Sequence, residues 1–330
     1  MGLVLSGLVT DLVYWRVFFW IFAPFLALIG VAAFFSFPKE HNDPKNKKKV
    51  DIAGSFSALA GFILLVFSLT ESENSGWSKP IVYVPFIISF VVLAAFAYIE
   101  TIVSNPIIPP QLWRNVSFTG IIIASFLLFG YWSSYVYFQV FISQDLLQES
   151  ALMTGIKCIP MAACGLFFSL LTGKLAEKIT VKKIFILAFG LLTIAPFAAS
   201  AFTPPYGPNG GFWSWLLPSQ LLAVAGISLG YVSTTIAIVS SVPVEFAGRG
   251  GGIVNSCFQV GGSVCLPLVS IGKASVANMS KYSDLSDIEK QAQGYHTTMF
   301  ICAGFSLLAL LIVIVTVKRG LKASGEAIVH

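Results

Sequence analysis

Charged side chains are scarce in this chain of 330 residues. Asp, Glu, Lys and Arg together make up 11% of it, whereas hydrophobic residues make up 56% and the mean hydropathy is +0.83. A soluble domain carries about 25% charged residues. A soluble core of this length could not hide so much apolar surface, so most of it must face lipid or other membrane helices. The composition predicts an integral membrane protein.

Cysteine and histidine are also few, with five and three residues. The cysteines are scattered through apolar runs without C-x-x-C spacing, which argues against a disulfide framework. No histidine cluster lies at membrane depth, so we expect neither a metal centre nor another cofactor. The glycine-rich run GRGGG at 248–252 lacks the Lys-Ser/Thr of a phosphate-binding loop. We therefore expect no nucleotide-binding site. The sequence shows no cluster of catalytic His, Asp or Ser residues near a span end, so we expect neither an enzyme nor a nucleic-acid partner.

Long apolar runs fill most of the chain. A helix needs about 20 apolar residues to cross the hydrocarbon layer. Nine runs satisfy this: 17–37, 52–70, 80–100, 117–142, 151–173, 183–202, 213–240, 250–273 and 295–317. A tenth run, 1–13, is too short, because thirteen helical residues rise only about 20 Å. The sequence predicts an all-α membrane bundle of nine full spans and one partial helix.

The connections between the runs alternate in positive charge. If the basic segment 38–51 is cytoplasmic, fourteen of the 20 Lys and Arg residues lie on that side. The other six lie outside: Arg16, Lys79, Lys157, Lys273, Lys281 and Lys290. Such a bias is what the positive-inside rule describes. We expect a cytoplasmic C-terminus in a multi-pass protein of the plasma membrane, with the vacuolar membrane as an alternative.

Two polar features on the predicted outer side have open interpretations. Asn278-Met279-Ser280 is a glycosylation sequon, although such tripeptides also arise by chance. Lys157 is the one charge well inside a predicted span. Its side chain either extends to the outer surface or pairs with Asp145 or Glu149 as part of an outer gate.

The inner connection GKLAEKITVKK places small and charged residues between two spans. Gly173 permits two helix ends to approach, and Glu177 and Lys178 are followed by the basic pair Lys182 and Lys183. Such a cluster either latches one conformation of a gate or forms an ordinary positive-inside loop. The stretch resembles the short cytoplasmic loop motif of the major facilitator superfamily. Thr180 and Val181 depart from that motif, where glycine and a basic residue are usual.

The opening segment GLVLSGLVTDLVYWRVFFWIFAP supports the same resemblance. It is similar to the glycine-rich antiporter signature of the superfamily's fifth helix, with Gly2, Ser6 and Gly7 as the remnant of that signature. Leu3 and Ser6 stand where proline and glycine are usual. The two spans at 52–70 and 80–100 resemble the inserted pair of the fourteen-span drug:proton antiporters, which include fungal multidrug and aminotriazole-resistance exporters. The resemblance implies that Met1 lies inside the fifth helix of an N-terminally truncated chain.

The resemblance also implies a domain organisation. Residues 1–37 would be the remnant of an N-terminal bundle, 38–51 a cytoplasmic linker and 52–100 the inserted helix pair. Residues 101–116 would be a second linker, 117–317 the C-terminal six-helix bundle and 318–330 a cytoplasmic tail.

Substrate would contact the polar and aromatic residues of the cavity-lining helices, which the resemblance assigns to 117–142, 151–173, 213–240 and 250–273. The candidates are Tyr131, Trp132, Tyr135, Gln139, Tyr231, Asn255 and Gln259. The amides have an alternative role in interhelical hydrogen bonds, and the tyrosines in an interfacial aromatic belt.

The resemblance implies a secondary active transporter that exports drugs or other small molecules in exchange for protons by alternating access. Its partners would be the substrate, protons and the lipid bilayer. The alternative is a transport-inactive fragment that needs a separate N-terminal half.

Overall fold

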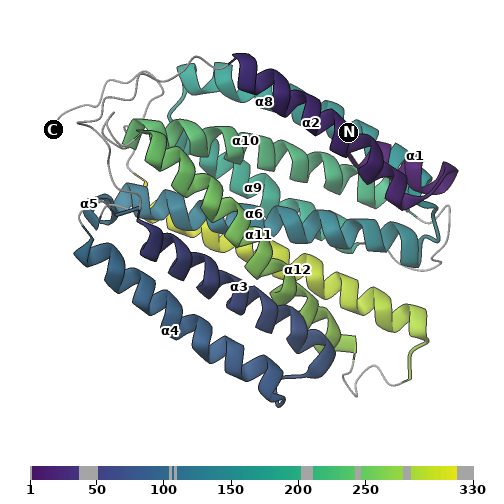
Figure 1. Ribbon diagram of the computed structural model, residues 1–330. Helices are drawn as coiled ribbons and strands as arrows, with labels where there is room; N and C mark the ends of the chain where they lie inside the picture. The colour runs from purple at the N-terminus through teal and green to yellow at the C-terminus, as the bar shows by residue number, and fades with distance from the viewer. Residues whose placement is uncertain are drawn as a thin grey trace.

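The computed structural model describes residues 2–36, 51–103, 106–107, 110–201, 211–241, 247–277 and 284–317. All regular elements within these residues are helices (Figure 1). Nine helical segments among them are long and apolar enough to cross a membrane. They coincide with the nine predicted runs, so the all-α, multi-span prediction is confirmed.

Twelve α-helices follow one another along the described chain. They are α1 (Gly2–Leu12), α2 (Trp15–Ser36), α3 (Ile52–Ser75), α4 (Pro80–Ile102), α5 (Pro110–Trp113), α6 (Val116–Phe141), α7 (Ala151–Lys157), α8 (Ile159–Lys178), α9 (Val181–Ser200), α10 (Leu217–Ser241), α11 (Ala247–Ala277) and α12 (Asp287–Thr316). Single π-helical turns at Ile142–Leu146 and Phe212–Leu216 extend α6 and precede α10. Helix α1 has 11 residues and rises about 16 Å, so it is a partial span, as predicted.

Local chemistry sets several helix boundaries. The Asn115 side chain accepts hydrogen bonds from the backbone N–H groups of Ser117 and Phe118 and caps α6. Ser286 and Glu289 form a capping box at the start of α12. The predicted span 151–173 is divided at Cys158, where α7 ends and α8 begins. Pro160 lies in the first turn of α8, where its missing N–H costs no helical hydrogen bond.

Helices α6 to α12 form a bundle whose centre is α6 and α10. The spans containing these two helices are 61% and 67% buried, whereas the span containing α7 and α8 is only 17% buried. Helix α6 packs against α11 and α12, and α10 packs against α8 and α9. Gly226 allows the close approach of α10 to α9, because a Cβ at this position would meet the Ala188 carbonyl. Because the span containing α7 and α8 is so little buried, one long side of α8 faces away from the bundle.

The remaining helices flank this bundle on two sides. Helices α3 and α4 pack together, and α3 lies against α11 (Figure 1). Helix α1 packs against α7, and no residue of α2 is buried.

The predicted domain boundaries stay a prediction. Most of the linker 38–51, part of the linker 101–116, and the tail 318–330 lie outside the described residues.

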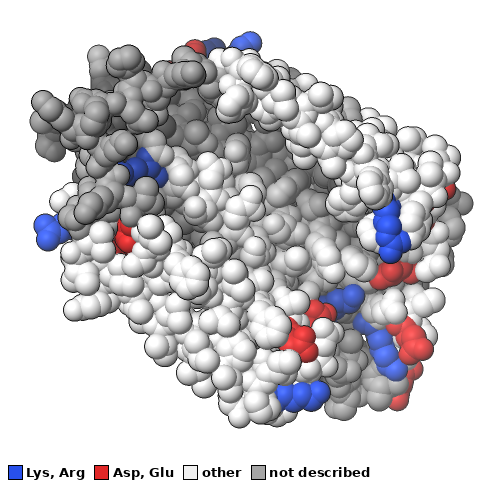
Figure 2. Space-filling model, in the orientation of Figure 1, with Lys and Arg blue, Asp and Glu red and all other residues white. Residues whose placement is uncertain are grey.

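The described charges on one face of the molecule gather toward the two ends of the helices, with a broad uncharged band between them (Figure 2). This distribution matches helices that cross an apolar layer, because an isolated charge at its centre is costly.

Candidate functional site

Two of the predicted substrate contacts lie in the core of the bundle. Tyr131 and Tyr135 are fully buried, and their rings stack 5.5 Å apart at an interplanar angle of 7°. The oxygens of the Tyr135 hydroxyl and Ser219 Oγ are 2.5 Å apart, and Ser219 Oγ donates to the Ala195 carbonyl oxygen at 2.6 Å. Tyr135 is therefore the donor to Ser219, and the chain of bonds joins α6, α10 and α9. Substrate contact by these tyrosines stays a prediction, as it does for the half-buried Trp132.

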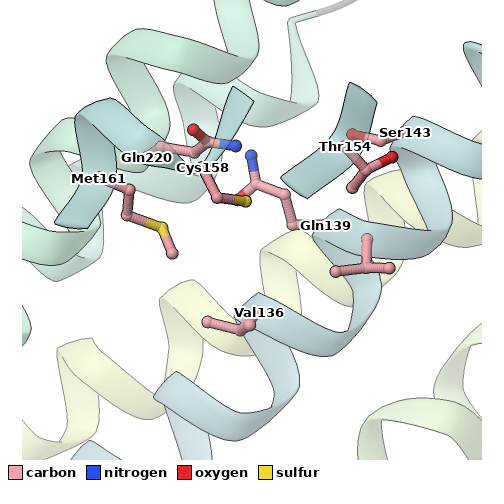
Figure 3. A pocket seen from close by; sticks show the side chains of 8 residues that line it. Val136, Gln139, Ser143, Thr154, Cys158, Met161 and Gln220 are labelled. Atoms are coloured by element: carbon pink, nitrogen blue, oxygen red, sulfur yellow. The ribbon is translucent and has the colours of Figure 1, made fainter. Parts of the chain in front are cut away.

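Gln139 lies in a different environment, at a cavity between α6, α7, α8 and α10 (Figure 3). The cavity is small, with a volume of about 10 Å³, which is room for about one water molecule. Gln139 and Gln220 extend toward one another across it, with Cys158 beside them. The lining residues are Val136, Gln139, Val140, Ser143, Thr154, Cys158, Met161 and Gln220.

A neighbouring cavity joins this region to α1. It has a volume of about 110 Å³, and Ser6, Gly7 and Thr10 of α1 line one wall. Val140, Thr154 and Cys158 line both cavities. The structure thus places two residues of the antiporter-signature remnant next to the cavity of Gln139. Gly2 lies at the start of α1.

The contact between α1 and α7 is close. A Cβ at Gly7 would meet the carbonyl oxygen of Ala151, so this position requires glycine for the two backbones to approach. Asp11 Oδ2 accepts a hydrogen bond of 2.8 Å from the Leu152 N–H in the first turn of α7. The acid also suits the positive end of that helix.

Tyr231 and Asn255 line a third, small cavity between α10 and α11, with a volume of about 40 Å³. Tyr231 is 42% exposed, and its ring lies 5.2 Å from that of Phe258. Asn255 Nδ2 donates to the Gly251 carbonyl oxygen on its own helix at 3.0 Å.

Gln259 lies elsewhere, in an apolar groove between α3 and α11. The groove is lined by Leu59, Phe62, Ile63, Val66, Phe67, Gln259, Val260 and Ser263. The structure therefore brings Tyr231 and Asn255 together and places Gln139 and Gln259 at separate cavities.

The predicted gating loop is the two-residue connection between α8 and α9. Gly173, Glu177 and Lys178 are exposed on the last turns of α8, as is Lys183 on the first turn of α9. Lys182 Nζ instead donates to the carbonyl oxygens of Ile314 and Val317, at 2.6 and 2.7 Å. A cation at these carbonyls stabilises the C-terminus of α12. A gating role for the loop stays a prediction.

Charged groups cluster where α6, α7, α11 and α12 meet the predicted outer surface. Lys157 pairs with Glu149, and their side chains are only 12% and 2% exposed. Of the two alternatives for Lys157, the structure has the ion pair. The Tyr295 hydroxyl donates to Asp145 Oδ2 at 2.5 Å, and Lys273 Nζ lies 4.0 Å from the centroid of the Tyr295 ring. Each charge in this cluster thus has a polar or aromatic neighbour.

Two further expectations concern metal binding and glycosylation. No group of three metal-ligating side chains occurs among the described residues. Asn278, the glycosylation candidate, lies outside them.

Sequence reasoning missed the polar residues that face Gln139. Gln220, Ser143 and Thr154 line the same cavity, and Ser219 bonds Tyr135. Gln220 carried a detectable signal, because an amide inside an apolar run needs a partner or a polar cavity. Its position opposite Gln139 depends on how α6 and α10 pack, which the run lengths do not specify.

Comparison with known proteins places the chain among transporters. Residues 1–266 match the family described as the Major Facilitator Superfamily. The chain is 24% identical over 329 residues to an uncharacterised MFS-type transporter of Schizosaccharomyces pombe, covering 99% of this chain and 60% of that protein. It is 26% identical over 335 residues to the puromycin resistance protein of Streptomyces alboniger, covering 98% and 65%.

A third relative is the multidrug transporter mfsC of Aspergillus fumigatus, which is 26% identical over 306 residues that cover 91% of this chain and 57% of mfsC. The chain thus spans about 60% of the length of the first relatives it matches. Because the family match extends over well more than half of its residues, the chain belongs to the Major Facilitator Superfamily, a family of integral membrane transporters rather than enzymes.

Proposed function

We propose that this chain is a secondary active transporter that exports drugs or other small molecules from the cytoplasm in exchange for protons by alternating access. The observation that carries the proposal is the family match over residues 1–266, together with the packing of the signature-bearing helix α1 against α7. The resemblance to the fourteen-span drug:proton antiporters supports the direction and the coupling ion. The printed names of the puromycin and multidrug relatives support the substrate class.

Alternating access requires a surface that can meet and leave an opposing bundle. The α1–α7 contact has the features of such a surface. It combines a glycine at the closest approach, Gly7, with one hydrogen bond, from the Leu152 N–H to Asp11. We propose that this contact closes the outer side and that it separates when the carrier opens outward.

The described acids of this chain lie toward the ends of helices, as Asp11, Glu100 and Asp145 illustrate. Proton coupling in the proposal therefore rests on the resemblance. Substrate would contact Gln139 at one cavity and Tyr231 and Asn255 at another. Gln259 and the three aromatic candidates on α6 would contact substrate only after the helices move.

A second candidate is that the chain transports only when a separate N-terminal half faces it. The observation that favours this candidate is exposure: no residue of α2 is buried, and the span containing α7 and α8 is 17% buried. These surfaces suit lipid or an opposing bundle of helices.

Export from cells separates the two candidates. The chain is expressed in yeast that lacks its own drug exporters, alone or together with the N-terminal half of mfsC, and puromycin efflux is measured. Efflux by the chain alone supports an autonomous exporter. Efflux only on co-expression supports the second candidate, and efflux in neither case contradicts both.

The proposed orientation has its own test. A cysteine is introduced at Asn46 in a chain whose five native cysteines have been replaced. A membrane-impermeant maleimide added to intact cells should leave it unlabelled and should label it after permeabilisation. Labelling from outside would reverse the topology and the proposed cytoplasmic C-terminus.

A further inference from the structure

Two buried carboxamides face a space of the size of a water molecule inside the bundle. Gln139 of α6 is 5% exposed and Gln220 of α10 is 1% exposed. Figure 3 shows them extending toward one another, and the cavity that they line has a volume of about 10 Å³. A buried water needs a space of about this size and two to four polar partners. The size of the cavity therefore admits water and excludes a larger ligand.

The oxygens of the two carboxamides lack a donor. Neither Nε2 nor Oε1 of Gln139 has a hydrogen-bond partner, and Oε1 of Gln220 has none. The Tyr135 hydroxyl lies within reach of the Gln139 side chain, and its oxygen can accept from Nε2 because its hydrogen is donated to Ser219. The two Oε1 atoms are both acceptors, so neither can satisfy the other. A water between them would donate one hydrogen to each.

A larger cavity of the same chemical character adjoins this one. It lies between α1, α6 and α7, and its volume of about 110 Å³ is room for several waters. Ser6, Thr10, Gln144 and Thr154 contribute polar side chains to its wall, and Thr10 is exposed, so the cavity reaches the molecular surface. An ion would need a counter-charge, and the described residues that line the two cavities include no Asp, Glu, Lys or Arg. The uncharged polar wall suits water.

Three residues connect the two cavities. Val140, Thr154 and Cys158 line both of them. Thr154 Oγ1 donates to the Ser150 carbonyl oxygen on its own helix at 3.0 Å, so its oxygen can accept from a water at the boundary. Beyond the carboxamides, Tyr135 is fully buried and lines neither cavity. The polar space therefore runs from α1 to the carboxamides and stops at the stacked tyrosines.

We propose that a file of water molecules enters between α1 and α7 and ends with one water that bridges Gln139 Oε1 and Gln220 Oε1. The bridging water joins α6 to α10. The file hydrates the core of the bundle from the α1 side to within one helical turn of Tyr135. The inference does not depend on what the chain transports or in which direction.

Radiolytic footprinting detects such water, because hydroxyl radicals formed from a water molecule oxidise a thiol beside it. Purified full chain in detergent is exposed to short X-ray pulses, and the oxidation rate of each native cysteine is measured by mass spectrometry. Cys158 lines both cavities, whereas Cys302 is fully buried and lines neither. Cys158 should be oxidised several times faster than Cys302, and equal rates would overturn the proposal.

The inner end of the file needs a reporter of its own. Ser143 is 2% exposed and lines the cavity of the carboxamides but not the larger one. Its replacement Ser143→Cys changes one atom and is made together with Cys158→Ala. The introduced thiol should be oxidised several times faster than Cys265, which is also 2% exposed but lines neither cavity.

Replacing both carboxamides tests the bridge. In the Ser143→Cys chain, the pair Gln139→Leu and Gln220→Leu should lower the oxidation rate of the introduced thiol to that of Cys265. The control Gln291→Leu, at an exposed position on α12, should leave the rate unchanged.

Two outcomes of these variants would overturn the proposal. Slow oxidation of the introduced thiol would confine the water to the larger cavity, as a direct hydrogen bond between the carboxamides requires. Fast oxidation that survives the double leucine replacement would show that the carboxamides do not hold the water. The comparison of native cysteines needs no substitution, so it tests the file even where a variant fails to fold.

Discussion

At the residue scale, the charges and hydroxyls buried in the bundle decide where single substitutions matter. Lys157 pairs with Glu149 Oε1, the Tyr135 hydroxyl has a hydrogen-bond partner and Tyr131 Oη has none. Removing one member of a buried pair leaves a group without compensation, whereas removing a group that has no partner relieves a cost. Replacing a buried polar group by an apolar one should therefore destabilise the protein where the group has a partner and stabilise it where the group has none.

The buried ion pair gives the largest expected effect. Lys157→Met should destabilise the protein by about 3–5 kcal/mol, because Glu149 is left charged and buried. The double variant Lys157→Met, Glu149→Gln should recover most of the loss. Unfolding in detergent, followed by intrinsic fluorescence, measures both.

A matched control is available on the surface. Lys290 pairs with Asp287 at 3.9 Å, and the Asp287 side chain is 98% exposed. Lys290→Met should cost less than about 1 kcal/mol. A comparable loss for the two lysine variants would contradict the structural role of the buried pair.

The stacked tyrosines provide a second test. Tyr135→Phe removes the donor to Ser219 and should cost about 1 kcal/mol. Tyr131→Phe removes a buried hydroxyl that has no partner, so it should be neutral or stabilising. Thermal unfolding of the two variants measures the difference, and equal losses would contradict the hydrogen-bond assignment.

At the element scale, the inner ends of α9 and α12 are joined by one side chain. Lys182, on the first turn of α9, donates to two carbonyl oxygens at the C-terminus of α12. These carbonyls have no partner within their own helix. The basic residues of the inner loop therefore differ in role, although they are adjacent in sequence.

Substitution separates the two lysines. Lys182→Met should lower the free energy of unfolding by about 1–2 kcal/mol, because it removes charge-assisted bonds and a favourable interaction with the helix dipole. Lys183→Met, at an exposed position, should change it by less than about 0.5 kcal/mol. Hydrogen exchange at the end of α12 should rise in the first variant only. The reverse order of effects would contradict the cap.

At the scale of the whole molecule, the length of apolar runs made the spans predictable. A run of about 20 apolar residues has few alternatives to a membrane helix, and Pro160 explains why one run is divided into α7 and α8. The residues that gather at each cavity were less accessible to sequence reasoning. Gln139 and Gln220 are on different helices, and their meeting depends on the crossing of α6 and α10. The separation of Gln259 from Asn255, likewise, comes from the packing of α3 against α11.

The central claim is that this bundle works in a carrier that exchanges a cytoplasmic small molecule for protons. Everted membrane vesicles from cells that express the chain together with an N-terminal half test it most directly. Puromycin uptake is measured after the lumen is acidified, with ATP absent. The account predicts accumulation that follows the size of the pH gradient and disappears with a protonophore. Uptake that is the same with and without the gradient, or that requires ATP, would contradict it.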